Sequence, residues 1–254
     1  MNITILIAFF VMLVISGVFS MFGKGGGSLY TPVLVMLGWE VGKAISTAIF
    51  LNFVTALVAT FVFMRNRLVD FKFSLIFIPG TIVGSILGAM LSSRAPKDVL
   101  LGIFAVFLFG VGILMVSTKG ETKQPVRSIS LGIGAGIVAF SFAVGVLSSL
   151  IGVGGGLIIF PFLVLYMKYP AQKAAGANSF IVTISSIVGT IGHFTIGQHI
   201  EYLLIGVTTV AVIIGSAIGS QITVKASPSF VKVAFAFIMW FFAVEIALHL
   251  LKII

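Results

Sequence analysis

The sequence predicts an all-α polytopic membrane protein made of two inverted repeats, and three observations carry this prediction. Apolar residues make up 59% of the 254 residues and charged residues only 8%, whereas an ordinary soluble domain has about 25% charged residues. The apolar residues form long runs without Asp, Glu, Lys or Arg, and a glycine-rich motif occurs once in each half of the chain. The net charge of +9 therefore indicates basic cytoplasmic loops rather than a nucleic-acid partner.

The charge-free runs give the elements in order. A spanning helix needs about 20 apolar residues, because the hydrocarbon core cannot bond free backbone polar groups. The first run has no basic start and no small-residue cleavage site, so we expect a retained span rather than a signal peptide. The runs are Met1–Gly23, Gly25–Trp39, Ala44–Met64, Phe73–Ser93, Val99–Thr118, Ser128–Met167, Ala174–Ile200, Tyr202–Val224 and Val233–Val244.

Two places in these runs cannot be regular helix. Ser128–Met167 is too long for one span, and it is interrupted by the glycine-rich segment 152–156 and then by Pro161. The first half carries the same interruption at residues 23–27, followed by Pro32. Several glycines followed by a proline break a helix. We therefore expect a full helix, an irregular turn at membrane depth and a half-helix at each place.

The two interruptions belong to an internal repeat whose matches keep their order along the chain. We predict an N-terminal transmembrane repeat over residues 1–118, a cytoplasmic linker over 119–127 and a C-terminal transmembrane repeat over 128–254. Each repeat is a glycine-broken helical unit followed by three transmembrane helices. The matched positions around the break are Ser20, Gly23, Gly25, Gly26, Gly27 and Pro32 with Ser149, Gly152, Gly154, Gly155, Gly156 and Pro161.

The basic residues favour inverted rather than parallel repeats. If each broken unit enters and leaves on one side of the membrane, ten Lys and Arg residues lie inside and four outside. If each broken unit crosses once, the same residues divide seven and seven. Basic residues concentrate in cytoplasmic loops, so the first arrangement is preferred.

Paired broken helices in inverted repeats indicate a transporter site near the bilayer midplane. Glycines before a half-helix leave N–H donors free and let a small ligand approach them, and the positive helix end attracts anions. The alternative is that the glycines only allow close packing, as we expect for Gly84, Gly88, Gly215 and Gly219. The substrate-binding candidates at the breaks are Lys24, Gly25, Gly26, Gly27, Ser28, Gly154, Gly155 and Gly156.

Three polar residues within the spans complete the candidate site. Asn178 and Ser179 lie early in the span that follows the second break, where they could contact substrate or bond a neighbouring helix. His193 lies deep in the same run and could contact an anion or carry a proton, because imidazole titrates near neutral pH. An interhelical hydrogen bond is the alternative for His193.

No enzyme signature occurs in the chain. Neither glycine-rich segment ends in Gly-Lys-Ser/Thr as a Walker loop does, and there is no HExxH, GxSxG or paired-carboxylate pattern. We therefore expect no enzyme activity, no cofactor and no metal.

Two halves that each open with an apolar helix, a GxGGG segment and a proline resemble the TauE/SafE family of sulfite exporter-like membrane transporters. The second half is most similar, in its glycine segment, in residues 174–179 and in Gly192-His193-Phe194 with Gly197 and Ile200. The first half differs from this pattern at Lys24, Ala48 and Ile49 and has no histidine opposite His193. The resemblance implies transport of small sulfur-containing anions such as sulfite, thiosulfate, sulfoacetate or other organosulfonates.

We therefore expect a secondary transporter for a small anion, working by alternating access of the two repeats in the cell (inner) membrane. A channel-like anion pathway would use the same residues, and a non-transporting scaffold subunit is a third hypothesis. The expected partners are the anionic substrate and the lipid bilayer. The stripes formed by Gly84 with Gly88 and by Gly215 with Gly219 could pack within the chain or between two copies, so a homodimer stays open.

Overall fold

The computed structural model describes residues 3–91, 97–118, 131–151, 155–195 and 202–251, which form helices joined by short turns and contain no strand. The predicted all-α architecture is therefore confirmed, whereas the predicted linker 119–127 lies outside the described residues. The helices of the first half are α1 (Ile3–Ser20), α2 (Gly27–Met36), α3 (Val41–Arg65), α4 (Phe71–Leu91) and α5 (Lys97–Ser117). Those of the second half are α6 (Leu131–Ile151), α7 (Gly156–Pro161), the π-helical η1 (Phe162–Tyr166), α8 (Ala171–Thr195), α9 (Tyr202–Lys225) and α10 (Pro228–Leu250).

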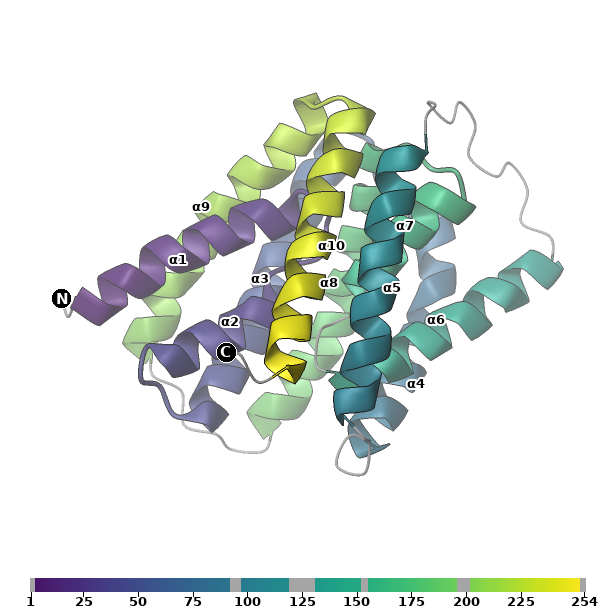
Figure 1. Ribbon diagram of the computed structural model, residues 1–254. Coiled ribbons are helices and arrows are strands. Elements are labelled where there is room, and N and C mark those ends of the chain that lie inside the picture. Colours follow the sequence, from purple (N-terminus) through teal and green to yellow (C-terminus); the bar gives the residue numbers. More distant parts are fainter. Residues whose placement is uncertain (1–2, 92–96, 119–130, 152–154, 196–201, 252–254) are drawn as a thin grey trace.

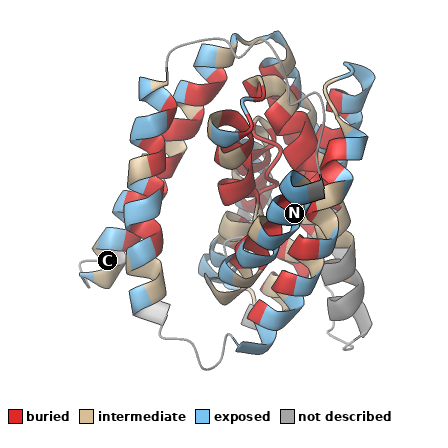
Figure 2. Cartoon of the chain, turned by 90° about the vertical axis from the view of Figure 1, so that its right-hand side faces the viewer, coloured by how far each residue is buried: buried red, intermediate tan, exposed pale blue. Residues whose placement is uncertain are grey.

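Six of the described helices are long and apolar enough to cross a membrane, namely α3, α4, α5, α6, α9 and α10. Their outward faces carry large exposed apolar side chains such as Phe61, Val106 and Phe237, and Figure 2 shows buried residues gathered on the inward faces. An apolar exterior around a buried interior is what lipid requires. The chain is thus a multi-pass membrane protein.

The helices pack in pairs that combine the two halves of the chain. Figure 1 shows α5 beside α10, with α1 and α9 crossing at one end of the molecule and α4 and α6 at the other. Since α6 corresponds to α1 and α9 to α4 in the sequence repeat, the two crossing pairs are equivalent. The helices α3 and α8 pack together between them.

Corresponding helices that touch run in opposite directions. Along α3 and α8, Thr60 bonds Thr183, and further on the Leu68 carbonyl lies against Gly176. Along α5 and α10, Gly112 lies against Trp240 and Gly102 against Leu250. The inversion of the two repeats stays a prediction, and this antiparallel packing supports it.

Glycine allows the two crossing pairs to approach closely. A Cβ at Gly84 would overlap the Phe142 carbonyl of α6, and a Cβ at Gly219 would overlap the Gly17 carbonyl of α1. Gly88 and Gly215 make equally close backbone approaches. These stripes of small residues therefore pack within one chain, as expected for helix pairs in membranes.

A polar contact outside the spans joins the start of α4 to the turn before α8. Asp70 caps α4, because its Oδ1 accepts the N–H of Phe73 at 3.1 Å. Its Oδ2 accepts the Tyr169 hydroxyl at 3.1 Å, and the Tyr169 ring stacks on Phe73 with centroids 4.8 Å apart. Burial, and then the neighbouring carboxylate, raise the pKa of Tyr169 above its ordinary range, so the hydroxyl stays a donor.

Candidate functional site

The first helix break lies between Ser20, where α1 ends, and Gly27, where α2 begins. The chain turns here through Gly23 and Gly25, whose φ angles are +66° and +73°. Side chains rarely adopt this left-handed region. A Cβ at Gly23 would also overlap the Ala175 carbonyl of α8. The expected irregular turn is present, and its glycines are needed both for conformation and for close contact with α8.

Several backbone donors at the start of α2 have no acceptor among the described residues. The Gly27 N–H donates to Asn52 Oδ1 at 2.9 Å. The N–H groups of Gly25, Gly26 and Ser28 have no acceptor among the described residues. Free donors at a helix start carry a partial positive charge, so this end of α2 favours an anion.

The second break has the same character. The Gly155 carbonyl accepts the N–H groups of Ile158 and Ile159, each at 3.1 Å. The N–H groups of Gly156 and Leu157 have no acceptor among the described residues. Because η1 continues α7 to Tyr166, these N–H groups lie at the glycine end of a longer half-helix, as they do in α2.

The two breaks meet in the middle of the molecule. A Cβ at Gly156 would lie 2.9 Å from Lys24 Cγ and 3.1 Å from Lys24 Cα. Asn178, which is fully buried on α8, donates its amide hydrogens to the Phe22 carbonyl at 2.8 Å and to the Gly156 carbonyl at 3.1 Å. One side chain thus ties both breaks together.

Lys24 is the basic side chain at this junction. Its side chain is 3% exposed, and its Nζ lies 2.6 Å from Ser28 Oγ, its one hydrogen-bond partner among the described residues. The Nζ also lies 4.5 Å from the ring centre of Phe19 and 5.2 Å from that of Phe242. The one ion pair that the described residues form is Lys43 with Glu40, on the surface. Among the described residues, Lys24 therefore has a hydroxyl and two rings around it but no carboxylate.

The structure brings most of the predicted site residues together. Lys24, Gly25, Gly26, Gly27 and Ser28 lie at the first break, and Gly155, Gly156 and Asn178 lie at the second. Ser179 is buried beside Gly23 and donates its hydroxyl to the Gly176 carbonyl at 2.8 Å. Gly154 lies outside the described residues, and His193 lies in α8 with a side chain outside them.

Asn52, which was not among the site residues predicted from the sequence, also contributes to the first break. Asn52 of α3 accepts the Gly27 N–H and donates to Ser186 Oγ of α8 at 2.7 Å. It thereby connects the start of α2 to the second half of the chain. In the sequence, Asn52 is recognisable only as an amide within an apolar span. Such an amide is equally typical of an ordinary interhelical hydrogen bond.

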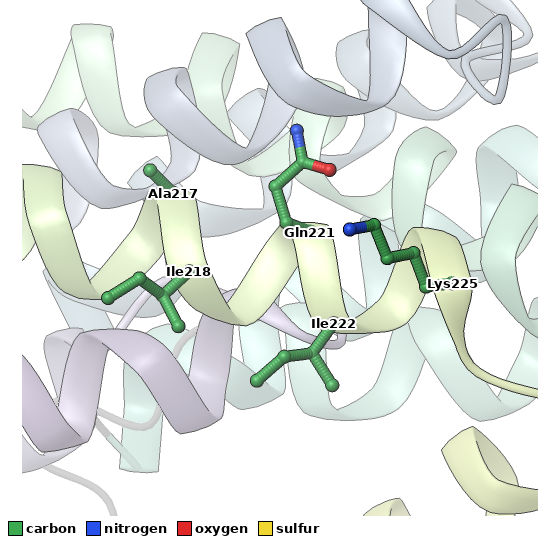
Figure 3. A pocket seen from close by; sticks show the side chains of 5 residues that line it. All are labelled: Ala217, Ile218, Gln221, Ile222 and Lys225. Atoms are coloured by element: carbon green, nitrogen blue, oxygen red, sulfur yellow. The ribbon is translucent and has the colours of Figure 1, made fainter.

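A shallow hollow lies elsewhere, along one side of α9 (Figure 3). Its lining comes from that helix alone, so it does not join the two halves. None of the predicted site residues lines it. The lining residues are Ala217, Ile218, Gln221, Ile222 and Lys225.

Comparison with known proteins gives a consistent result. The model of the family described as "Sulfite exporter TauE/SafE" matches residues 8–246. The probable membrane transporter protein YunE of Bacillus subtilis is 26% identical, over 76% of this chain and 81% of its own length. The probable membrane transporter protein MJ0441 of Methanocaldococcus jannaschii is 25% identical, over 87% and 86% respectively. No solved structure matches the chain.

Proposed function

Because the chain belongs to the sulfite exporter TauE/SafE family, we propose that it is a secondary transporter that holds a small anion where the two helix breaks meet. The family and the relatives named as probable membrane transporters support transport as the activity. The preferred substrates are small sulfur oxyanions and organosulfonates, in keeping with the family description. The alternating-access mechanism and the inner cell membrane location are part of the proposal.

The observation that carries the proposal is the burial of the Lys24 side chain at the junction. A buried ammonium without a carboxylate is unfavourable unless another anion neutralises it. N–H groups without an acceptor among the described residues lie at both breaks, and the positive ends of two half-helices add to the attraction. A small anion would satisfy all of these groups at once.

The residues divide into ligand-contacting and positioning groups in this proposal. Lys24, Ser28 and the N–H groups of Gly25, Gly26, Gly156 and Leu157 contact the anion, whereas the Gly27 N–H is bonded to Asn52 Oδ1. The amide hydrogens of Asn178 are already bonded to two backbone carbonyls, and the Ser179 hydroxyl is bonded to Gly176. Asn178 and Ser179 therefore hold the two breaks in place.

The packing supports alternating access of the two repeats. Contacts between the two halves of the chain join the breaks, as in Asn178 with Phe22 and Gly156 with Lys24. The anion would then sit between two bodies that move relative to each other. A site in the middle of the membrane requires a motion that opens it alternately to one side of the membrane and to the other.

A thermal-shift experiment on the purified protein tests anion binding. The panel contains the sodium salts of sulfite, thiosulfate, methanesulfonate, sulfoacetate, sulfate and chloride, at up to millimolar concentration. A ligand that binds only the folded state raises stability by about 2.7 kcal/mol at 100 times its Kd. We expect a concentration-dependent rise in Tm for at least one sulfur oxyanion or sulfonate, which Lys24→Gln abolishes. The absence of any shift across the panel would overturn the proposal.

A further inference from the structure

We propose that Lys24 binds the coupling proton, so that the anion and one proton enter the site together. This inference rests on the proposed function and adds a second substrate to it. In the empty site Lys24 is a neutral amine; with the anion present it is an ammonium. One anion and one proton would therefore move in the same direction in each transport cycle.

The surroundings of Lys24 favour the neutral amine when no anion is bound. The side chain is almost completely buried, and Ser28 Oγ is its one hydrogen-bond partner among the described residues. The rings of Phe19 and Phe242 attract a cation. This attraction is smaller than the hydration that a buried ammonium loses, so the proton is held weakly without a counter-charge.

The described groups on the surrounding helices supply no such counter-charge. The elements next to Lys24 are α1, α2, α7, α8 and α10. In α2, Tyr30 is bonded to Thr55. In α10, Lys232 donates to the Thr118 carbonyl at 3.1 Å, Glu245 is exposed, and the side chain of His249 lies outside the described residues. The described part of α1 and all of α7 contain no titratable side chain. In α8, the titratable residues are Lys173 in the first turn and His193 near the other end of the helix.

A bound anion changes this balance. Its negative charge, close to Nζ, stabilises the ammonium and raises the affinity for the proton, and by linkage the proton raises the affinity for the anion. The second repeat has Val153 at the position that matches Lys24. Only one lysine therefore lies in the paired glycine segments, which predicts one proton for each anion.

This assignment differs from the coupling role expected for His193. Both groups could carry a proton, but only Lys24 lies at the junction of the two breaks in the described part of the chain. A proton on Lys24 acts on the anion directly. The two assignments predict opposite results for substitutions at the two positions.

Proton uptake on binding provides the test. Thiosulfate is titrated into the purified protein at pH 8 in two buffers with different ionisation enthalpies, since thiosulfate itself does not titrate near this pH. The difference between the two calorimetric enthalpies gives the protons taken up. We expect about one proton per anion for the wild type, with affinity falling about tenfold per pH unit as the pH rises. His193→Gln should behave in the same way.

Two variants at Lys24 complete the design. Lys24→Arg keeps a fixed charge, so it should bind thiosulfate without proton uptake and with little pH dependence. Lys24→Met should fold with an undiminished Tm, because it removes a buried polar group, and should lose anion binding. Thiosulfate binding by the wild type without proton uptake would overturn this inference and leave the proposed function standing. Proton uptake that persists in Lys24→Arg, or is lost only in His193→Gln, would also overturn it. An absence of binding by every anion of the panel would overturn both proposals.

Discussion

Substituting Gly156 by alanine tests whether the two helix breaks form one site. The added Cβ would lie 2.9 Å from Lys24 Cγ and 3.1 Å from Lys24 Cα. These distances are about 0.5 Å and 0.3 Å short of ordinary van der Waals contact, so Lys24 has to move away from the second break. A shift of about 1 Å can cost 10²-fold in a positioned site. We therefore expect about tenfold weaker anion binding, or about 1.4 kcal/mol, and a loss of stability of about 1 kcal/mol.

The neighbouring glycine supplies a matched control. A Cβ at Gly155 would lie 3.4 Å from Val144 Cγ1, its nearest neighbour, and the backbone φ of −63° suits alanine. Gly155→Ala should therefore keep wild-type affinity in an anion titration followed by Tm. Equal affinities for Gly156→Ala and the wild type would refute the reasoning, because the breaks would not meet as described. Equal losses in both variants would also refute it, because contact with Lys24 would not be the cause.

Three further predictions concern the packing around the site. Gly219→Ala should lower the free energy of unfolding by about 1–3 kcal/mol, since the added Cβ overlaps the α1 backbone. Its control is Gly206→Ala on the same helix, where the added Cβ meets no atom within 4 Å and Tm should stay unchanged or rise. Equal Tm values for the two variants would contradict the packing of α1 on α9. Asn178→Leu leaves two backbone carbonyls without their donor, and each carbonyl should lower the free energy of unfolding in denaturant by about 1–3 kcal/mol. An unchanged denaturation midpoint would show that these bonds do not hold the breaks. Tyr169→Phe removes the bond to Asp70 and should cost about 1 kcal/mol without changing anion affinity, and a weakened affinity would contradict its separation from the site.

The helix breaks could be predicted because their cause is local. Consecutive glycines are poor helix formers and readily adopt the positive φ seen at Gly23 and Gly25. The prolines do not end the half-helices, because Pro32 lies inside α2 and η1 continues the helix past Pro161. The close packing at Gly84 and Gly219 could also be predicted, since a stripe of small residues has few other uses in a membrane helix.

The limits of the last helix were harder to predict from charge-free runs. The run 233–244 underestimates α10, which extends over Pro228–Leu250. Lys232 lies near its start and donates to the Thr118 carbonyl just after the end of α5, while Glu245 reaches the exposed face. Charged side chains near helix ends find partners or water, so a charge does not mark where a span stops.

The tertiary connections could not be read from the sequence. The role of Asn52 depends on which face of α3 meets α2 and α8, and an apolar span gives no signal for this because lipid and protein interior are equally apolar. The partners of Asn178 are 156 and 22 residues away along the chain. Long-range contacts of this kind follow from the pairing of the two halves rather than from local pattern.

Counterflow in proteoliposomes tests the central claim most directly, namely that a small anion is carried by a site shared between the two breaks. Vesicles are loaded with unlabelled thiosulfate and diluted into a trace of labelled thiosulfate, with wild-type protein or Lys24→Gln. The account predicts transient accumulation of label by the wild type, faster with substrate inside than without, and none by Lys24→Gln. Label entry without stimulation by internal substrate would indicate a channel-like pathway, and equal accumulation by Lys24→Gln would show that the anion is not held at the helix breaks.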